Sequence, residues 1–248
     1  MGIIFEERQS DSPFIETIWR SYAGDGGHFM SLAVSRWQMV VSRLRGRIAI
    51  TLRGPETRAS DAYCPPDAEF VGVFFRLGTF MPRLPASQLV DGELWLPQAG
   101  SRSFWLHGST WQFPDFENID VFVDRLFREG LLVHEPIVDA ALQGRVTGLS
   151  QRSVQRRFLR ATGLTHTNVH QIERARYATA LLRQGMSILD VVDLAGYTDQ
   201  PHLTRALKRW IGQTPAQIAA GATVLGFSRP FMQGQPLRAL SDTARIGA

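Results

Sequence analysis

Residues 148–158 read GLSQRSVQRRF, and residues 196–207 read GYTDQPHLTRAL. The second stretch repeats the first at a constant step of 49 residues (203 − 154), once one extra residue, Asp199, is allowed near its start. The matched pairs are Val154 with Leu203, Arg156 with Arg205, Phe158 with Leu207, Arg160 with Arg209, Gly163 with Gly212 and Thr165 with Thr214. A compact repeat that keeps arginine at fixed places on a short helix indicates two copies of one DNA-reading unit.

The second copy has the helix caps and the turn glycine that are typical of a helix-turn-helix. Ser187 is an N-cap residue in front of an apolar-periodic segment, and Gly196 ends that segment because glycine accepts the left-handed backbone of a tight turn. Thr198 or Asp199 caps the next helix, whose first turn holds Pro201 where a missing N–H costs little. Helix, glycine turn and helix together predict a helix-turn-helix unit.

Each predicted recognition helix has one apolar face and one outward face. The apolar faces hold Val154, Phe158 and Ala161 in the first copy and Leu203, Leu207 and Trp210 in the second. The outward faces hold Arg152, Gln155, Arg156 and Arg160 in the first copy, and Pro201, Thr204, Arg205 and Lys208 in the second. Arginine can bond guanine O6 and N7 in parallel, and glutamine can do the same at adenine N6 and N7. Arg157 lies off the outward face, so we expect it to meet phosphate or solvent.

A helix between the two copies is predicted from Thr165 to Gly185, and another begins with a capping-box pattern at Thr214. The intervening helix is long enough to hold the two units at a fixed separation. Recognition helices in successive major grooves lie about 34 Å apart, and a shorter spacing in the protein would require bent DNA.

Positive charge is concentrated around these units. Residues 145–221 contain eleven basic and four acidic residues, a net charge of +7, whereas the rest of the chain sums to −3. Such clustering is typical of a protein that binds a polyanion, although a solvated basic surface would give the same total.

Other features of the sequence limit the classes of protein to which the chain can belong. The single cysteine, Cys64, excludes an intramolecular disulfide and a cysteine-based zinc site, and it fits a reducing compartment. The first eight residues lack the layout of a secretion signal, and no apolar run approaches the roughly 20 residues that cross a bilayer. We therefore expect a soluble, cytoplasmic protein without a membrane partner.

The chain is predicted to be α+β, with a β-rich, barrel-like domain over residues 1–115. The segment 47–53 alternates so that Ile48, Ile50 and Leu52 share one face. Further strands are expected over 30–34, 38–44, 70–77 and 94–96, separated by glycine- and proline-rich turns. Many short strands with such turns favour a small barrel or sandwich.

The pattern becomes helical after Pro114. Apolar residues at helical spacing predict an amphipathic linker helix over 118–128 within a linker region 116–134. Residues 135–221 form the predicted DNA-binding domain, and residues 222–248 form a tail without clear periodicity, expected to be loosely ordered or packed as an extension.

Residues 145–218 resemble the DNA-binding domain of the AraC family of bacterial transcription regulators. The resemblance rests on LSxRxVQRxF (149–158), TGLT (162–165), RARxAxxLL (174–182), AGYxDQxHLxRxLKR (195–209) and GQTP (212–215). It implies seven helices, two helix-turn-helix units, RNA polymerase as a partner and a homodimer. By position, it assigns base reading to Arg152, Gln155 and Arg156 in the first unit and to Gln200, His202, Thr204 and Arg205 in the second, and phosphate contact to Lys208. One departure is the connection 143–147, which is long and contains glycine, so the first unit is expected to be irregular.

The resemblance also implies a β-barrel sensor in front of the reader, and residues 71–90 are similar to one sensor type of the family. An apolar effector pocket could be lined by Trp19, Trp37, Trp95, Trp105 and Trp111, with His28 or Arg36 as a polar anchor. The alternative is that these aromatic side chains simply fill the core of the β-rich domain.

Catalysis and metal binding have little support. His28 and His107 stand alone, and the i, i+4 pair His166 and His170 lacks an acidic third ligand, which favours surface histidines over a zinc site. No serine has the Gly-x-Ser-x-Gly context of a nucleophile, and no motif predicts a cofactor.

The leading hypothesis is a non-enzymatic regulator that binds double-stranded DNA and is modulated by a small-molecule effector. One alternative is a regulator without a ligand, controlled by its abundance. Another is a small-molecule-binding barrel or enzyme that retains a helical appendage. The outward arginine faces on both copies speak against this last alternative.

Overall fold

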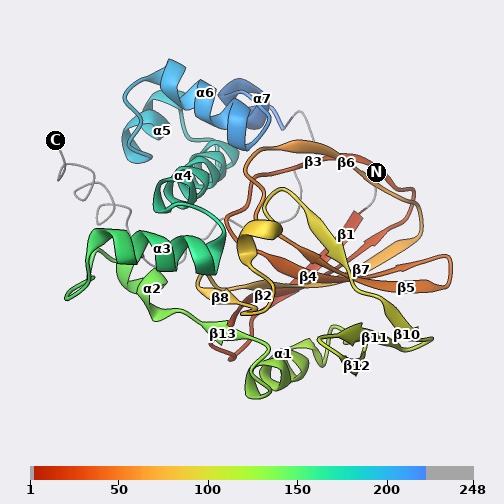
Figure 1. Ribbon diagram of the computed structural model, residues 1–248. Coiled ribbons are helices and arrows are strands. Elements are labelled where there is room, and N and C mark those ends of the chain that lie inside the picture. Colours follow the sequence, from red (N-terminus) through yellow and green to blue (C-terminus); the bar gives the residue numbers. More distant parts are fainter. Residues whose placement is uncertain (1–2, 222–248) are drawn as a thin grey trace.

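The computed structural model describes residues 3–221 as a β-rich region followed by a helical region (Figure 1). The predicted α+β class is confirmed. The tail predicted over 222–248 lies outside the described residues. Within the described residues, no helix is both long and apolar enough to span a bilayer.

The β-rich region consists of one large antiparallel sheet and three small ones. Its strands are β1 (Ile3–Arg8), β2 (Ile15–Ala23), β3 (Gly27–Ser31), β4 (Gln38–Leu44), β5 (Arg47–Arg53), β6 (Ser60–Cys64), β7 (Ala68–Phe75), β8 (Thr79–Phe80), β9 (Glu93–Trp95), β10 (Gln98–Gly100), β11 (Ser103–Leu106) and β12 (Ser109–Gln112), with β13 (Val133–His134) following later. The large sheet has the order β1-β2-β7-β4-β5-β9. Strand β3 pairs with β6, β8 with β13, and β10, β11 and β12 pair in sequence.

The hairpin of β4 and β5 shows how local sequence sets this sheet. Ile50 and Leu52 are fully buried, as the alternating pattern predicted. The two-residue turn Arg45-Gly46 has positive φ at both positions, 49° and 75°, which is the conformation of the turn that matches the twist of paired strands. The turn thereby fixes the register in which Leu44 faces Arg47.

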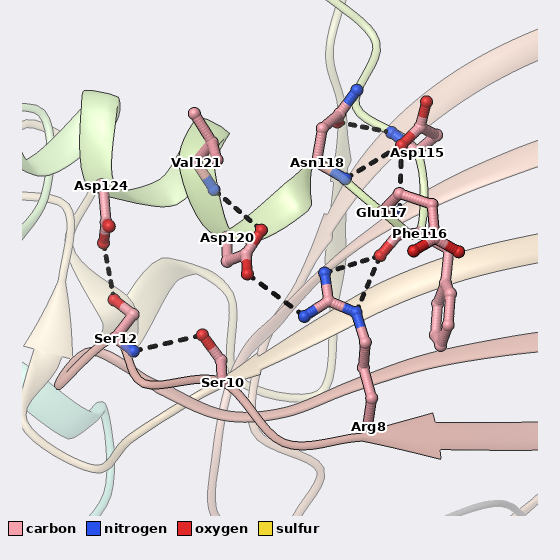
Figure 2. A network of polar contacts seen from close by, with 10 residues as sticks. All are labelled: Arg8, Ser10, Ser12, Asp115, Phe116, Glu117, Asn118, Asp120, Val121 and Asp124. Atoms are coloured by element: carbon pink, nitrogen blue, oxygen red, sulfur yellow. Dashed lines mark hydrogen bonds and ion pairs between the residues drawn. The ribbon is translucent and has the colours of Figure 1, made fainter.

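The helix predicted over 118–128 is present as α1 (Ile119–Arg128) and packs against the large sheet (Figure 1). Its buried residues are Ile119, Val123 and Leu126, which join the apolar core of the sheet. Figure 2 shows the polar side of this contact: Arg8 donates to the carbonyl of Phe116 at 2.7 and 3.0 Å and pairs with Asp120, and the Ser12 hydroxyl donates to Asp124 at 2.7 Å. The helix is therefore part of the β-rich region's core.

The helical region contains α2 (Pro136–Leu142), α3 (Gln151–Thr162), α4 (His166–Arg183), α5 (Ile188–Leu194), α6 (Gln200–Trp210) and α7 (Pro215–Ala219). From residue 135 to residue 221 there are thus six helices, where the resemblance implied seven. Helix α1, whose apolar face is buried against the sheet, precedes this region.

The N-caps predicted at Ser187 and Thr214 are present, and Ser150 and Thr165 are N-caps as well. Ser150, Thr165, Ser187 and Thr214 each accept a hydrogen bond from the backbone N–H three residues later, as N-cap side chains do. Of the two candidates for α6, Asp199 is the cap, accepting from the His202 N–H at 2.6 Å. The extra residue in the second copy therefore serves to begin its recognition helix.

The two regions share an apolar core and a buried ionic cluster. Ala33 and Phe80 of the β-rich region are buried among the helical side chains. Arg36, whose side chain is 4% exposed, pairs with Glu16 of β2 and with Glu173 of α4, the latter at 2.8 Å. Arg176 of α4 donates to the Ala33 carbonyl at 3.2 Å. The central helix of the helical region, α4, is thus fixed to the β-rich region by charge as well as by packing.

Candidate DNA interface

Helix α3 presents three free polar side chains on one face. Arg152, Gln155 and Arg156 are exposed, whereas Phe158 and Ala161 point into the core. Successive helical residues are rotated by about 100°, so positions 152, 155 and 156 fall within a sector of about 100° on one side of the helix. None of the three makes a hydrogen bond or ion pair with another described residue. Their donors and acceptors are available for an external partner.

Two other arginines of α3 are used within the protein. Arg157 donates to both carboxylate oxygens of Glu135, at 3.0 and 2.7 Å, which corrects the expectation that it meets phosphate or solvent. The Arg160 guanidinium lies 5.9 Å from the ring centroid of Phe80, at the border with the β-rich region. Arg160 is nevertheless exposed and lies one helical turn after Arg156, beside the other three candidates.

Helix α6 presents a second free face. Gln200, Arg205 and Lys208 are exposed and make no hydrogen bond or ion pair with another described residue. Thr204 is half-buried beside them. His202 is also half-buried, and its ring stands edge-on against Tyr197 at 5.2 Å between centroids, so this side chain is held against the turn that precedes α6.

A further arginine, which the sequence did not single out, supports the second turn. Arg174 of α4 donates to the Gly196 carbonyl at 3.2 Å and lies over the Tyr197 ring at 4.2 Å. A cation over an aromatic face is attractive, and Tyr197 itself is buried. Arg174 thus braces the α5–α6 turn from the central helix. The GYxDQ motif does not predict this contact, because Arg174 lies on another helix, about 20 residues earlier in the chain.

The two helix-turn-helix units differ in the length of their turns. The connection from α2 to α3 covers residues 143–150, and the one from α5 to α6 covers residues 195–199. The first unit is therefore present but has a longer turn, in line with the irregularity expected from its sequence. Gly144 and Gly148 have positive φ in this turn, at 64° and 74°.

Three of the residues suggested for an effector pocket lie apart. Trp19 packs across Gly72 in one apolar cluster, and Trp37 lies in another, where its indole N–H donates to the Thr79 carbonyl at 2.6 Å. His28 is exposed and pairs with Asp61. Trp19 and Trp37 are both buried in apolar clusters, as expected from the alternative that the tryptophans fill the core.

The described residues contain a polar cavity elsewhere on the β-rich region. Its volume is about 220 Å³, and its lining residues are Arg53, Glu56, Arg58, Ser60, Asp91, Gly92 and Glu93. Burial raises the pKa of Glu56, although the Ser31 hydroxyl that donates to its carboxylate at 2.8 Å opposes this shift.

The histidines considered for zinc are not surface side chains as expected. His166 and His170 are both half-buried, and burial lowers the pKa of each. The His166 ring lies against Phe158, 5.5 Å between centroids. Across residues 3–221, no group of three or more His, Cys, Asp or Glu side chains is arranged to hold a metal ion.

The helical region is similar to known proteins. Residues 144–221 match the model of a helix-turn-helix domain family. The chain is 28% identical over 183 residues to the HTH-type transcriptional regulator RipA of Corynebacterium glutamicum, covering 67% of this chain and 54% of that protein. It is 33% identical over 110 residues to the HTH-type transcriptional regulator VirS of Mycobacterium tuberculosis, covering 36% of this chain and 32% of that protein. The chain therefore spans about half the length of RipA and a third of VirS.

Proposed function

We propose that this chain, whose residues 144–221 form a DNA-binding helix-turn-helix domain of the AraC family, is a transcription regulator that reads two successive major grooves. In this proposal residues 135–221 bind DNA, and residues 1–115 with the connecting region 116–134 form a sensor or dimerisation part. The base-reading side chains are those of the free faces of α3 and α6, with Lys208 on phosphate.

One observation carries this proposal: both outward faces present polar side chains that have no partner among the described residues. Arg152 and Arg156 on α3 and Arg205 on α6 have no partner among the described residues. Arg157 and Arg174, by contrast, are paired inside the protein. Arg156 and Arg205 occupy equivalent positions of the repeat, so each unit presents a free arginine at the same place on its second helix.

Selection of duplexes from a random library tests the function. A regulator of this kind enriches one sequence and binds it about 10³- to 10⁷-fold more tightly than random DNA at the same salt concentration. If the retained duplexes share no sequence and binding simply falls with salt, the chain contacts phosphates only and the proposal is overturned.

Arg156→Ala should remove base preference at one position of the half-site that α3 reads. A bidentate contact from arginine to guanine contributes about 1–3 kcal/mol of discrimination, or roughly 5- to 150-fold in affinity ratio. The measurement is a competition between the selected duplex and single-base variants of it. Arg157→Ala is the matched control, because it removes the neighbouring arginine that is paired with Glu135. An unchanged preference in Arg156→Ala would mean that the second unit reads alone.

A small-molecule effector remains part of the proposal, but its site is moved from Trp19, His28 and Trp37. The candidate site is now the polar cavity of about 220 Å³ lined by charged side chains that include Arg53, Arg58 and Asp91. A cytoplasmic location, a homodimer and contact with RNA polymerase are proposed from the family resemblance.

A further inference from the structure

Two glycines at equivalent places in the repeat both face the β-rich region. Gly163 follows α3 and Gly212 lies just beyond α6, 49 residues later (212 − 163). Both have positive φ, 74° and 80°, as glycines that close helices commonly do. This backbone conformation explains why glycine occurs there, but it does not explain what lies next to each residue.

Gly163 rests on the segment around η1 (Ala86–Gln88). A Cβ atom added to Gly163 would lie 2.9 Å from the carbonyl carbon and oxygen of Ala86, and 2.9 Å from Val90. These distances are shorter than real Cβ contacts, and the Ala86 atoms belong to the backbone and cannot rotate away. We call Ala86 and Val90 the first seat.

Gly212 rests on a second place in the β-rich region. An added Cβ would lie 2.8 Å from the sulfur of Met30 and 3.1 Å from the Cβ of Ala59. Beside it the Ala33 N–H donates to the Trp210 carbonyl at 2.8 Å, and the Ala59 N–H donates to the Arg209 carbonyl at 3.2 Å. These bonds satisfy carbonyls at the end of α6 that have no partner within the helix. We call Met30, Ala33 and Ala59 the second seat.

The two seats are bonded to each other. Thr57, two residues before Ala59, donates to Asp91 from its backbone N–H at 2.6 Å and from its hydroxyl at 2.5 Å. Asp91 directly follows Val90 of the first seat, and its own N–H donates to the Pro55 carbonyl at 2.8 Å. One continuous piece of the β-rich region therefore contacts the C-terminal ends of both recognition helices.

We propose that the β-rich region sets the spacing between the two half-sites that the chain accepts, because its joined seats fix the C-terminal ends of α3 and α6. This inference rests on the proposed function. Within the helical region, α4 connects the two helix-turn-helix units. The two seats of the β-rich region provide a second connection between the ends of α3 and α6. The residues of the seats are positioning residues: they contact no DNA, and they act through the helices they hold.

The test measures binding of the full-length chain to duplexes in which the two selected half-sites are moved apart or together by two base pairs. Such a change rotates one half-site by about 70° relative to the other, since B-DNA has 10–10.5 base pairs per turn. The wild-type chain should prefer the selected spacing by about tenfold or more, and the double variant Gly163→Ala with Gly212→Ala should reduce this preference to about twofold. Gly185→Ala is the matched control: its φ is 85°, yet an added Cβ meets nothing within 4 Å.

A second variant avoids loss of folding as an explanation. Met30→Ala with Val90→Ala shrinks both seats and leaves the glycines in place. Hydrogen exchange at the amides of Ala33 and Ala59 reports whether the second seat has opened. Faster exchange with an unchanged spacing preference would overturn the inference. A wild-type chain that selects no sequence would instead reject the proposed function, so the two failures are distinguishable.

Discussion

Replacing Glu173 with glutamine is expected to lower the free energy of unfolding by about 3–5 kcal/mol, because it removes one partner from a buried ionic cluster. Glu173 lies between Arg36, at 2.8 Å, and Arg176 on its own helix, and it also accepts from the Ser35 hydroxyl at 2.5 Å. Glutamine keeps the size of the side chain and removes its charge. The Arg36 and Arg176 charges would then be balanced by Glu16, with Glu56 also acting on Arg176.

The charges around Glu173 indicate how strongly this site favours a carboxylate. Burial raises the pKa of Glu173, but the nearby Arg36 and Arg176 charges, with hydrogen bonds from Ser35 and Arg36, outweigh burial and place it below its usual value. At Glu16 the balance is reversed, since burial outweighs the attraction of Arg36 and the pKa is raised. Glu173 is therefore the member of the cluster whose negative charge the structure stabilises most clearly.

Urea unfolding followed by tryptophan fluorescence measures this effect. Glu129→Gln is the matched control, because Glu129 pairs with Arg125 on a helix surface where the two side chains are 43% and 63% exposed. Exposed pairs of this kind contribute about 0.3–0.5 kcal/mol. A loss for Glu173→Gln as small as that of the control would show that the cluster does not stabilise the junction of the two regions.

Replacing Arg205 with alanine is expected to weaken binding of the selected duplex by roughly 5- to 150-fold and to abolish preference at one base pair, a loss of about 1–3 kcal/mol. Arg205 is exposed on the free face of α6 and has no partner among the described residues. Its removal therefore leaves no buried group unsatisfied and should not change the stability of the protein. Titration against duplexes that vary at each position measures both quantities.

Two further variants separate base reading from charge. Lys208→Ala should weaken binding to all duplexes about equally. It should also reduce, by about one, the slope of the logarithm of the binding constant against the logarithm of the salt concentration, as expected for a phosphate contact. Arg47→Ala removes a cation next to the turn of the β4–β5 hairpin, which Figure 1 shows away from α3 and α6, and should have little effect on binding. A uniform loss in Arg205→Ala, like that in Lys208→Ala, would mean that Arg205 contacts phosphate only.

The helical region was predictable because its signals are local. Caps, glycine turns and apolar periodicity each depend on residues within a few positions, and the internal repeat gives every signal twice. The strands β4 and β5 were also predicted with their bounds, since their hairpin is joined by a two-residue turn. Strand β2, by contrast, was not predicted. It is irregular near its start, where its register with β7 shifts between Ile15 and Thr17, and this hides the alternation.

The residues of the candidate site were predictable only where the spacing along one helix decides which side chains are exposed. The outward positions of Arg152, Arg156 and Arg205 follow from helical spacing alone. The pairing of Arg157 with Glu135 and the packing of Arg160 on Phe80 depend on residues from other elements, so no local pattern reveals them. The separation of Trp19, Trp37 and His28 was hidden for a similar reason. Short strands do not show which cluster a tryptophan joins until the sheet order is known.

The most direct test of two recognition helices in two grooves is methylation interference at guanine N7, which lies in the major groove. The account predicts two clusters of interfering guanines on one face of the duplex, about one helical turn apart. Arg156→Ala should remove an interfering guanine from one cluster and Arg205→Ala from the other. A single cluster, or loss from the same cluster in both variants, would contradict it.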